Sequence, residues 1–458
     1  MSRDSNDYLD RLARMARRVR FDDLSLSAVE AAKAVVLDTL GAILAGSRLD
    51  ENVKLADFVA ERSGHRTAML IGHARKAEPM FAALANATAG VALEVDEGNR
   101  WGGGHPAIHV LPAALALAEE LAADGARFVE ALVAGYEVTS RIGGATRQRA
   151  NVHSHGTWGT AGAAVAAARL LGHGPVALRA VINLATSMSP ANTWTPCFEG
   201  ATIRNLYPGR AGLQGILAVH LLDCGFTPVK DAPADVYGTI LAEAFDAEAA
   251  VAGLGDDDRV ATFRIERNYF KFHACCYYNH PALDAVHQLV RDGGIAPADV
   301  DHIDVTSIPF VPRMADPAPV TMLSAKFSIP YAVAAAVVRH GTFVDAFTDD
   351  ARADERVRGL ASRVAVRGDE SMSLRSDGVT ARVAIALRDG RTLSGETRVA
   401  HGDAANPPDR AERLKKFATL AVPVLGATRA AQVIAMVDAI ETLKDIHLLT
   451  DLLMTTVR

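Results

Sequence analysis

Cysteine is scarce in this sequence, with four residues in 458. So few cysteines in a chain of this length exclude a disulfide-stapled secreted scaffold. Two of them, Cys275 and Cys276, are neighbours, and adjacent cysteines rarely bridge because the geometry is strained. Residues 1–24 are polar and charged, and they lack the apolar core of a signal peptide. We therefore expect a protein of the reducing cytoplasm.

Several other features are missing. Apolar stretches such as "GTAGAAVAAARLLG" are too short and too often interrupted to span a membrane. The formal net charge is −6 and there is no Lys/Arg-rich run, so a nucleic-acid partner is not expected. Neither kind of phosphate-binding glycine loop occurs, so nucleotide and nicotinamide cofactors are not predicted. The metal-binding spacings H-E-x-x-H and C-x-x-C are missing too, which disfavours a metal.

The hydrophobic pattern divides the chain into three parts. From Tyr8 to about Ala261, segments such as "SLSAVEAAKAVVLDTLGAILAG" have capping residues and helical spacing. After about Thr262, "DVDHIDVTSIPF", "RVAVRGDES" and "VTARVAIALRDGRTLSGETRVAH" alternate in the manner of strands, with "RDGRT" as a hairpin turn. The end is helical again. We predict a mainly α protein: a large all-helical domain formed by residues 1–265 and 401–458, with a smaller α+β domain inserted at 266–400.

Two stretches in the helical part carry candidate site residues. In "EVDEGNRWGGGHPAIHV", a polar, Gly-rich loop places Asp96, Asn99 and His105 before a proline at an expected helix start. The alternative is a surface loop with a capping carboxylate. In "NVHSHGTWGTAGAA", His153 and His155 precede a helix whose N-terminus favours an anion. An H-x-H pair can also bind metal, but nothing nearby completes such a site.

Two later stretches add basic groups. Arg204 and Arg210 in "EGATIRNLYPGRAGLQG" can clamp a carboxylate but cannot act as a base; the alternative is a solvated surface arginine. Lys271 lies among aromatic residues, including Tyr269, in "NYFKFHACCYYNHPALDAV". Burial there would lower its pKa, although a lysine that extends its ammonium to water fits equally well. The residues thus predict a cofactor-independent pocket for an anionic substrate and for proton transfer.

Taken in this order, these stretches resemble the 2-methylcitrate dehydratase family, also called MmgE/PrpD. The similarity covers nearly the whole chain. The segments that carry it are "VLDTLGAILAG", "DEGNRWGGGHPAIHVLPAALALAE", "GYEVTSRIG", "HSHGTWGTAGAAVAAARLLG", "ATIRNLYPGRAG", "KFHACCYYNHPALDAV", "AKFSIPYAVAAAVVRHG" and "HGDAANPP…RLKKF".

The resemblance implies a homodimer, a lid role for the inserted domain, an active site between the domains, and cofactor-free chemistry on small di- or tricarboxylates. Carried over by position, it places Asp96, His105, His153 and Lys271 in the catalytic site. Arg204 stands where the family usually has lysine, and Gly98-Asn99 replaces its common Thr-His. Those departures fall in the substrate region.

Our hypothesis from the sequence assigns proton exchange to His105 and His153, with Asp96 orienting His105. Arg204 and Lys271 bind carboxylates and stabilise developing negative charge, although a neutral Lys271 is an alternative base. Contacts to substrate are further expected from three residues: Asn99, His155 and Tyr269. We predict a lyase of the dehydratase type acting on a small polycarboxylate. The alternatives are an epimerase or isomerase, a decarboxylase, or a catalytically silent relative.

Overall fold

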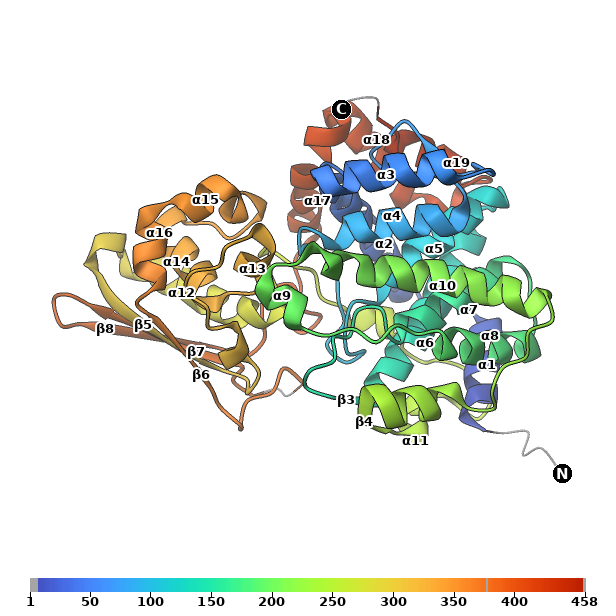
Figure 1. The fold of residues 1–458 in the computed structure, drawn as a ribbon, viewed down its shortest axis with the longest axis horizontal. Coiled ribbons are helices and arrows are strands. Elements are labelled where there is room, and N and C mark those ends of the chain that lie inside the picture. The colour runs from blue at the N-terminus through green and yellow to red at the C-terminus, as the bar shows by residue number, and fades with distance from the viewer. Residues whose placement is uncertain (1–6, 376–377, 456–458) are drawn as a thin grey trace.

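The computed structural model describes residues 7–375 and 378–455. Figure 1 shows a larger lobe of helices, which contains both ends of the described chain, beside a smaller lobe of helices and a four-stranded sheet. The predicted mainly α class is confirmed. No helix among the described residues is long and apolar enough to cross a membrane.

The larger lobe is built from helices that precede and follow the sheet in the sequence. It also contains two short antiparallel strand pairs and a π-helix at Pro233–Leu241. Its helices are α1 (Tyr8–Arg18), α2 (Leu26–Gly46), α3 (Asp50–Arg62), α4 (Pro79–Val91), α5 (Pro106–Glu120), α6 (Gly125–Ala145), α7 (Gly159–Leu170), α8 (Pro175–Ser187), α9 (Thr195–Glu199), α10 (Leu206–Asp223), α11 (Ala247–Val251), α17 (Arg410–Leu425), α18 (Ala427–Asp438) and α19 (His447–Thr450). Its strands are β1 (Ala68–Met69), β2 (Lys76–Ala77), β3 (Thr146–Gln148) and β4 (Ala242–Phe245).

Caps and small residues explain the geometry of these helices. The Ser25 side chain accepts a hydrogen bond from the Ala28 N–H at the start of α2, as a capping serine does. A Cβ added at Gly135 of α6 would lie 2.5 Å from the carbonyl oxygen of Gly162 in α7. Only glycine permits so close an approach of two backbones. The Ala- and Gly-rich composition therefore sets how tightly the helices around the site pack.

The smaller lobe holds a sheet of order β6-β5-β7-β8, in which β5 pairs parallel with β6 and antiparallel with β7. Strands β7 and β8 pair antiparallel across the predicted hairpin, where Gly390 has a φ of +90°. The elements are α12 (His280–Gly293), β5 (Val300–Ser307), α13 (Met322–Lys326), α14 (Ile329–Arg339), α15 (Asp349–Ala353), α16 (Glu355–Ala361), β6 (Val364–Gly368), β7 (Ala381–Leu387) and β8 (Thr392–Thr397).

Each lobe has its own main hydrophobic core. One buried cluster joins α1, α2 and α5–α8 with the C-terminal helices, and a second joins α12 and α14 with the sheet. Helix α17 returns the chain to α2, where the Lys416 ammonium lies 2.5 Å from the Asp38 carboxylate. The domain boundaries at 265 and 400, and the role of the smaller lobe as a lid, stay predictions.

Candidate active site

A cavity of about 170 Å³ lies where loops of the larger lobe meet the smaller lobe. Six of the eight predicted site residues line it: Asn99, His105, His153, His155, Arg204 and Tyr269. Asp96 and Lys271 stand behind these residues, fully buried, and contact them or their partners. The predicted residues, although spread over 175 positions of the sequence, are therefore brought together in one place.

The loop between α4 and α5 is held by its own polar groups. The Asn99 side-chain oxygen accepts hydrogen bonds from the N–H groups of Trp101 and Gly102 at 3.0 and 2.7 Å. Its side-chain nitrogen donates to the Arg264 carbonyl at 2.8 Å. Asn99 thus uses its side-chain amide to shape the loop. It also lines the cavity, and its predicted contact with substrate stays a prediction.

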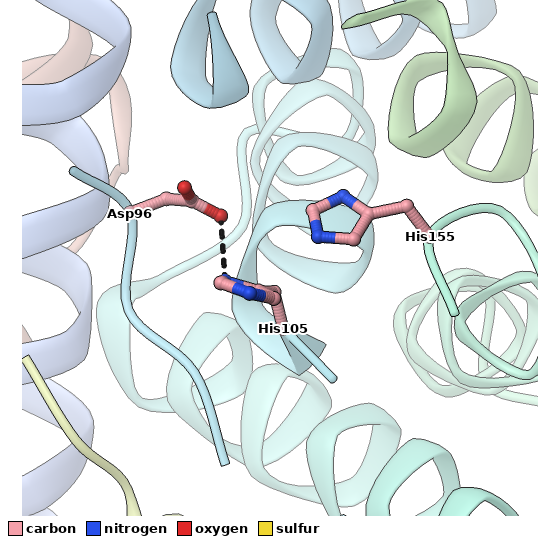
Figure 2. Close-up of side chains that lie close together, drawn as sticks. All are labelled: Asp96, His105 and His155. Atoms are coloured by element: carbon pink, nitrogen blue, oxygen red, sulfur yellow. Dashed lines mark ion pairs between the residues drawn. The ribbon is translucent and has the colours of Figure 1, made fainter. Parts of the chain in front are cut away.

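His105 precedes Pro106, the first residue of α5, so its ring is fixed at a helix start. The His105 Nδ1 lies 2.7 Å from the Glu97 carbonyl oxygen and 3.0 Å from Asp96 Oδ2 (Figure 2). Two acceptors beside Nδ1 assign the proton to that nitrogen. The Nε2 lone pair then faces the cavity, where it accepts a long hydrogen bond of 3.4 Å from the Tyr269 hydroxyl.

Among the described residues, one group of side chains could hold a metal ion: Asp96, His105 and His155, whose ligand atoms lie within 4.8 Å of one another. Figure 2 shows His155 on a separate segment, with its ring directed toward the Asp96–His105 pair. His105 Nδ1 donates to the Glu97 carbonyl oxygen, so only Nε2 of that ring could ligate a metal. The Lys271 ammonium also lies 3.5 Å from Asp96, where it would repel a cation. These groups fit proton transfer better than metal ligation.

His153 is the second cavity histidine. Its Nδ1 accepts a hydrogen bond from the His155 backbone N–H at 3.0 Å, so the proton of the neutral ring is on Nε2. Nε2 has no hydrogen-bond partner among the described residues, and the ring packs against Trp194 in a tilted arrangement with the centroids 4.1 Å apart. Burial, together with the charge of Arg204, lowers the pKa of His153 well below its usual range. His153 therefore presents a neutral N–H donor to the cavity.

His155 and His109 lie beside this pair. Burial, and then the charge of Arg204, lowers the pKa of His155 well below its usual range, and neither of its ring nitrogens has a described partner. The Nε2 of His109 accepts from the Gly156 N–H at 2.9 Å, and its Nδ1 lies 2.7 Å from the His105 carbonyl. His109 thus ties the His105 segment to the His153 segment. Our sequence reasoning missed it, although it lies only four residues after His105, near the start of the helix that follows.

Four buried charges stand behind the histidines. Arg204 Nη2 lies 2.5 Å from Glu94 Oε1, and Lys271 Nζ lies 3.0 Å from Glu94 Oε2 and 3.5 Å from Asp96 Oδ1. Burial alone would lower the pKa of Lys271, but the two carboxylates raise it above its usual value. The cations in turn lower the pKa of Glu94 and Asp96 against the effect of burial. All four groups are charged, and their charges sum to zero.

Glu94 is the main residue that sequence reasoning missed, although it begins the quoted loop. It has a φ of +55°, a region that non-glycine residues seldom adopt, and this conformation turns its carboxylate toward both cations. The adjacent Cys275 and Cys276 behave as small apolar residues: all four cysteines are free, and burial raises the thiol pKa of Cys275 and Cys276 to about 12. Arg210 donates to the Asn192 side chain and does not line the cavity.

Two family models match most of the chain. The MmgE/PrpD N-terminal domain matches residues 10–249, and the MmgE/PrpD C-terminal domain matches residues 273–442. The chain belongs to the MmgE/PrpD family.

Among its relatives is the cis-aconitate decarboxylase of Aspergillus terreus, 25% identical over 96% of this chain and 94% of that protein. The human cis-aconitate decarboxylase is 26% identical over 93% of this chain and 90% of that protein. The mouse cis-aconitate decarboxylase is 24% identical over 96% of this chain and 92% of that protein.

Proposed function

We propose that this chain is a cofactor-independent lyase of the dehydratase type that acts on a small di- or tricarboxylate. The observation that carries the proposal is the pairing of two differently protonated histidines in one cavity. His105 offers an unprotonated Nε2, and His153 offers a protonated Nε2. A base and an acid that face the same substrate are what a proton-transfer lyase needs.

The reaction follows from these two atoms. His105 Nε2 takes the proton from the carbon next to a substrate carboxylate, and the Asp96 carboxylate, 3.0 Å from Nδ1, stabilises the imidazolium that forms. His153 Nε2–H donates a hydrogen bond to the departing hydroxyl, and the proton held on His105 Nε2 passes to that oxygen, which leaves as water. Each proton transfer contributes roughly 10²–10⁴-fold to the rate.

The negative charge that develops on the substrate needs a positive neighbour. Arg204 lines the cavity, and its Nε has no hydrogen-bond partner among the described residues. Lys271 has no exposed surface, so it acts through its charge and through Glu94 rather than by direct contact. Its raised pKa keeps it protonated, so our proposal assigns the base to His105 and not to Lys271.

Decarboxylation is the second candidate, because the relatives named above are cis-aconitate decarboxylases. The same histidines serve it: a proton is delivered to carbon and the electrons come from the bond that releases carbon dioxide. Epimerisation is the third, in which one histidine removes a proton and the other returns one to the opposite face. We also propose, from the family resemblance, that the protein is a cytoplasmic homodimer, which light scattering of the purified chain tests.

A substrate screen separates the three reactions. The purified protein is dialysed against EDTA and incubated with cis-aconitate, 2-methylcitrate, citrate and aspartate-derived dicarboxylates. The masses of the products are then measured by mass spectrometry. Loss of water identifies the lyase, loss of carbon dioxide the decarboxylase, and an unchanged mass with altered optical rotation the epimerase. Activity that disappears with EDTA and returns with a metal would contradict cofactor-independent chemistry.

A further inference from the structure

The cations of the cavity wall differ in whether a carboxylate already neutralises them. Arg204 is paired with Glu94 at 2.5 Å. Arg100, which also lines the cavity, is paired with Asp403 at 2.9 Å. Arg375 lines the cavity as well, and among the described residues no carboxylate lies within 4.0 Å of its guanidinium. Of the three arginines that line the cavity, Arg375 is therefore the one whose positive charge is not cancelled by a paired carboxylate among the described residues.

The guanidinium of Arg375 is held in place by the loop that carries His105. Arg375 Nε donates to the Arg100 carbonyl at 3.1 Å, and Arg100 Nη1 donates to the Leu374 carbonyl at 2.6 Å. A Cβ at Gly103, where φ is +68°, would lie 3.3 Å from Arg375 Nη2. These contacts occupy Nε and place Nη2 beside a residue that has no side chain to cover it.

Arg375 comes from the loop between β6 and β7, whereas the histidines come from the larger lobe. Arg375 is also exposed, whereas Arg204 is buried, so the two arginines stand at the outer and inner parts of one cavity. Trp194, Tyr278 and Phe327 also line it and present apolar faces for the carbon chain of a substrate.

We propose that Arg375 binds a second substrate carboxylate at the outer part of the cavity and selects substrates with carboxylates at two positions. The inference rests on the proposed function, since it places the reacting carboxylate near Arg204 and the histidines. The planar guanidinium is suited to a carboxylate because its N–H groups match the two oxygens. Because the inner four charges sum to zero, Arg375 is the group that makes the cavity favour an additional negative charge.

The test compares Arg375→Gln with wild type and with a matched control. Glutamine keeps an N–H that can donate to the Arg100 carbonyl but removes the charge. The control is Arg367→Gln, an exposed arginine on β6 that does not line the cavity. Calorimetry measures the binding of tricarballylate, a saturated tricarboxylate with no leaving hydroxyl, and of pentanoate, which has one carboxylate. Neither measurement requires turnover.

We expect Arg375→Gln to raise the Kd for tricarballylate about 10- to 100-fold, the effect of losing one charge-assisted contact. The Kd for pentanoate stays unchanged, and Arg367→Gln leaves both constants at the wild-type values. Arg375→Lys keeps the positive charge but loses the two parallel N–H groups of the guanidinium, so we expect a smaller rise in the Kd for tricarballylate. With a reactive substrate, the loss appears mainly in KM rather than in kcat.

Two results would overturn the inference. One is a Kd for tricarballylate that is the same in Arg375→Gln and wild type. The other is an equal loss for tricarballylate and pentanoate, which would mean that Arg375 only shapes the loop. If the wild-type protein binds neither tricarballylate nor any other polycarboxylate, the proposed function itself is wrong and the inference falls with it.

Discussion

Replacing Asp96 by asparagine removes one negative charge while keeping the shape of the side chain. In the native protein Asp96 Oδ2 lies 3.0 Å from His105 Nδ1. The Nδ1–H also donates to the Glu97 carbonyl at 2.7 Å, a bond that the substitution leaves intact. The proton therefore stays on Nδ1 and Nε2 keeps its lone pair. The change acts on the stability of the imidazolium, not on the tautomer.

The size of the effect follows from Coulomb's law. Two unit charges 3 Å apart interact by about 5 kcal/mol at an effective dielectric constant of about 20. The amide dipole of asparagine and the Glu97 carbonyl recover part of this energy. A net loss of about 1.5–3 kcal/mol, typical of a lost hydrogen bond to a charged group, lowers kcat about 10- to 150-fold. In this variant Glu94 is the one carboxylate of the cluster that remains beside Lys271 and Arg204. We therefore also expect the free energy of unfolding to fall by about 3–5 kcal/mol.

Stability and catalysis are separated by a second variant. Asp38→Asn also removes a buried carboxylate that pairs with a lysine, Lys416 at 2.5 Å, but Asp38 does not line the active-site cavity. Both variants are assayed for kcat after their folded fraction is measured by urea denaturation. Asp96→Asn should lose kcat and stability, and Asp38→Asn stability alone. A folded Asp96→Asn protein with the wild-type kcat, or an equal loss of kcat in Asp38→Asn, would refute the reasoning.

Three further predictions follow from the same geometry. His153→Ala should lower the kcat of the folded protein about 10²–10⁴-fold, because it removes the N–H donor; a loss below fivefold in steady-state kinetics would count against this role. Iodoacetamide at neutral pH should leave Cys275 and Cys276 of the folded protein unmodified, as judged by peptide mass mapping, because burial raises their pKa to about 12. Burial lowers the pKa of His109 from 6.5 to about 4, so the unfolded chain binds its proton first as the pH falls. The free energy of unfolding should therefore decrease from pH 6.5 toward pH 4, and less steeply in His109→Gln; equal slopes in the two proteins would exclude His109 as the cause.

Local signals account for what the sequence predicted. The Ser25 cap and the glycine of the β7–β8 turn influence only residues close to them in the sequence. The helix and the hairpin could therefore be predicted directly. Asp96 and His105 share one loop, and their proximity was foreseeable for the same reason.

Contacts between distant segments could not be predicted. The pairing of Lys271 with Glu94 joins residues 177 positions apart, and no spacing rule reports it. That pairing decides the charge of Lys271, so the alternative of a neutral lysine base stayed open until the fold was known. Arg375 lies in a polar loop without a motif, and its contacts with Arg100 and Gly103, which relate it to the site, appear only in the folded chain.

The central claim is that His105 and His153 move protons at a carbon next to a carboxylate without a cofactor. Proton NMR in D₂O, with EDTA-treated protein and the best substrate of the screen, tests it most directly. The account predicts that deuterium enters at that carbon, or that its proton is lost to solvent, at a rate that falls at least 10²-fold in both His105→Gln and His153→Gln. Product formation with no exchange of that proton, or at the wild-type rate in both folded variants, would contradict it.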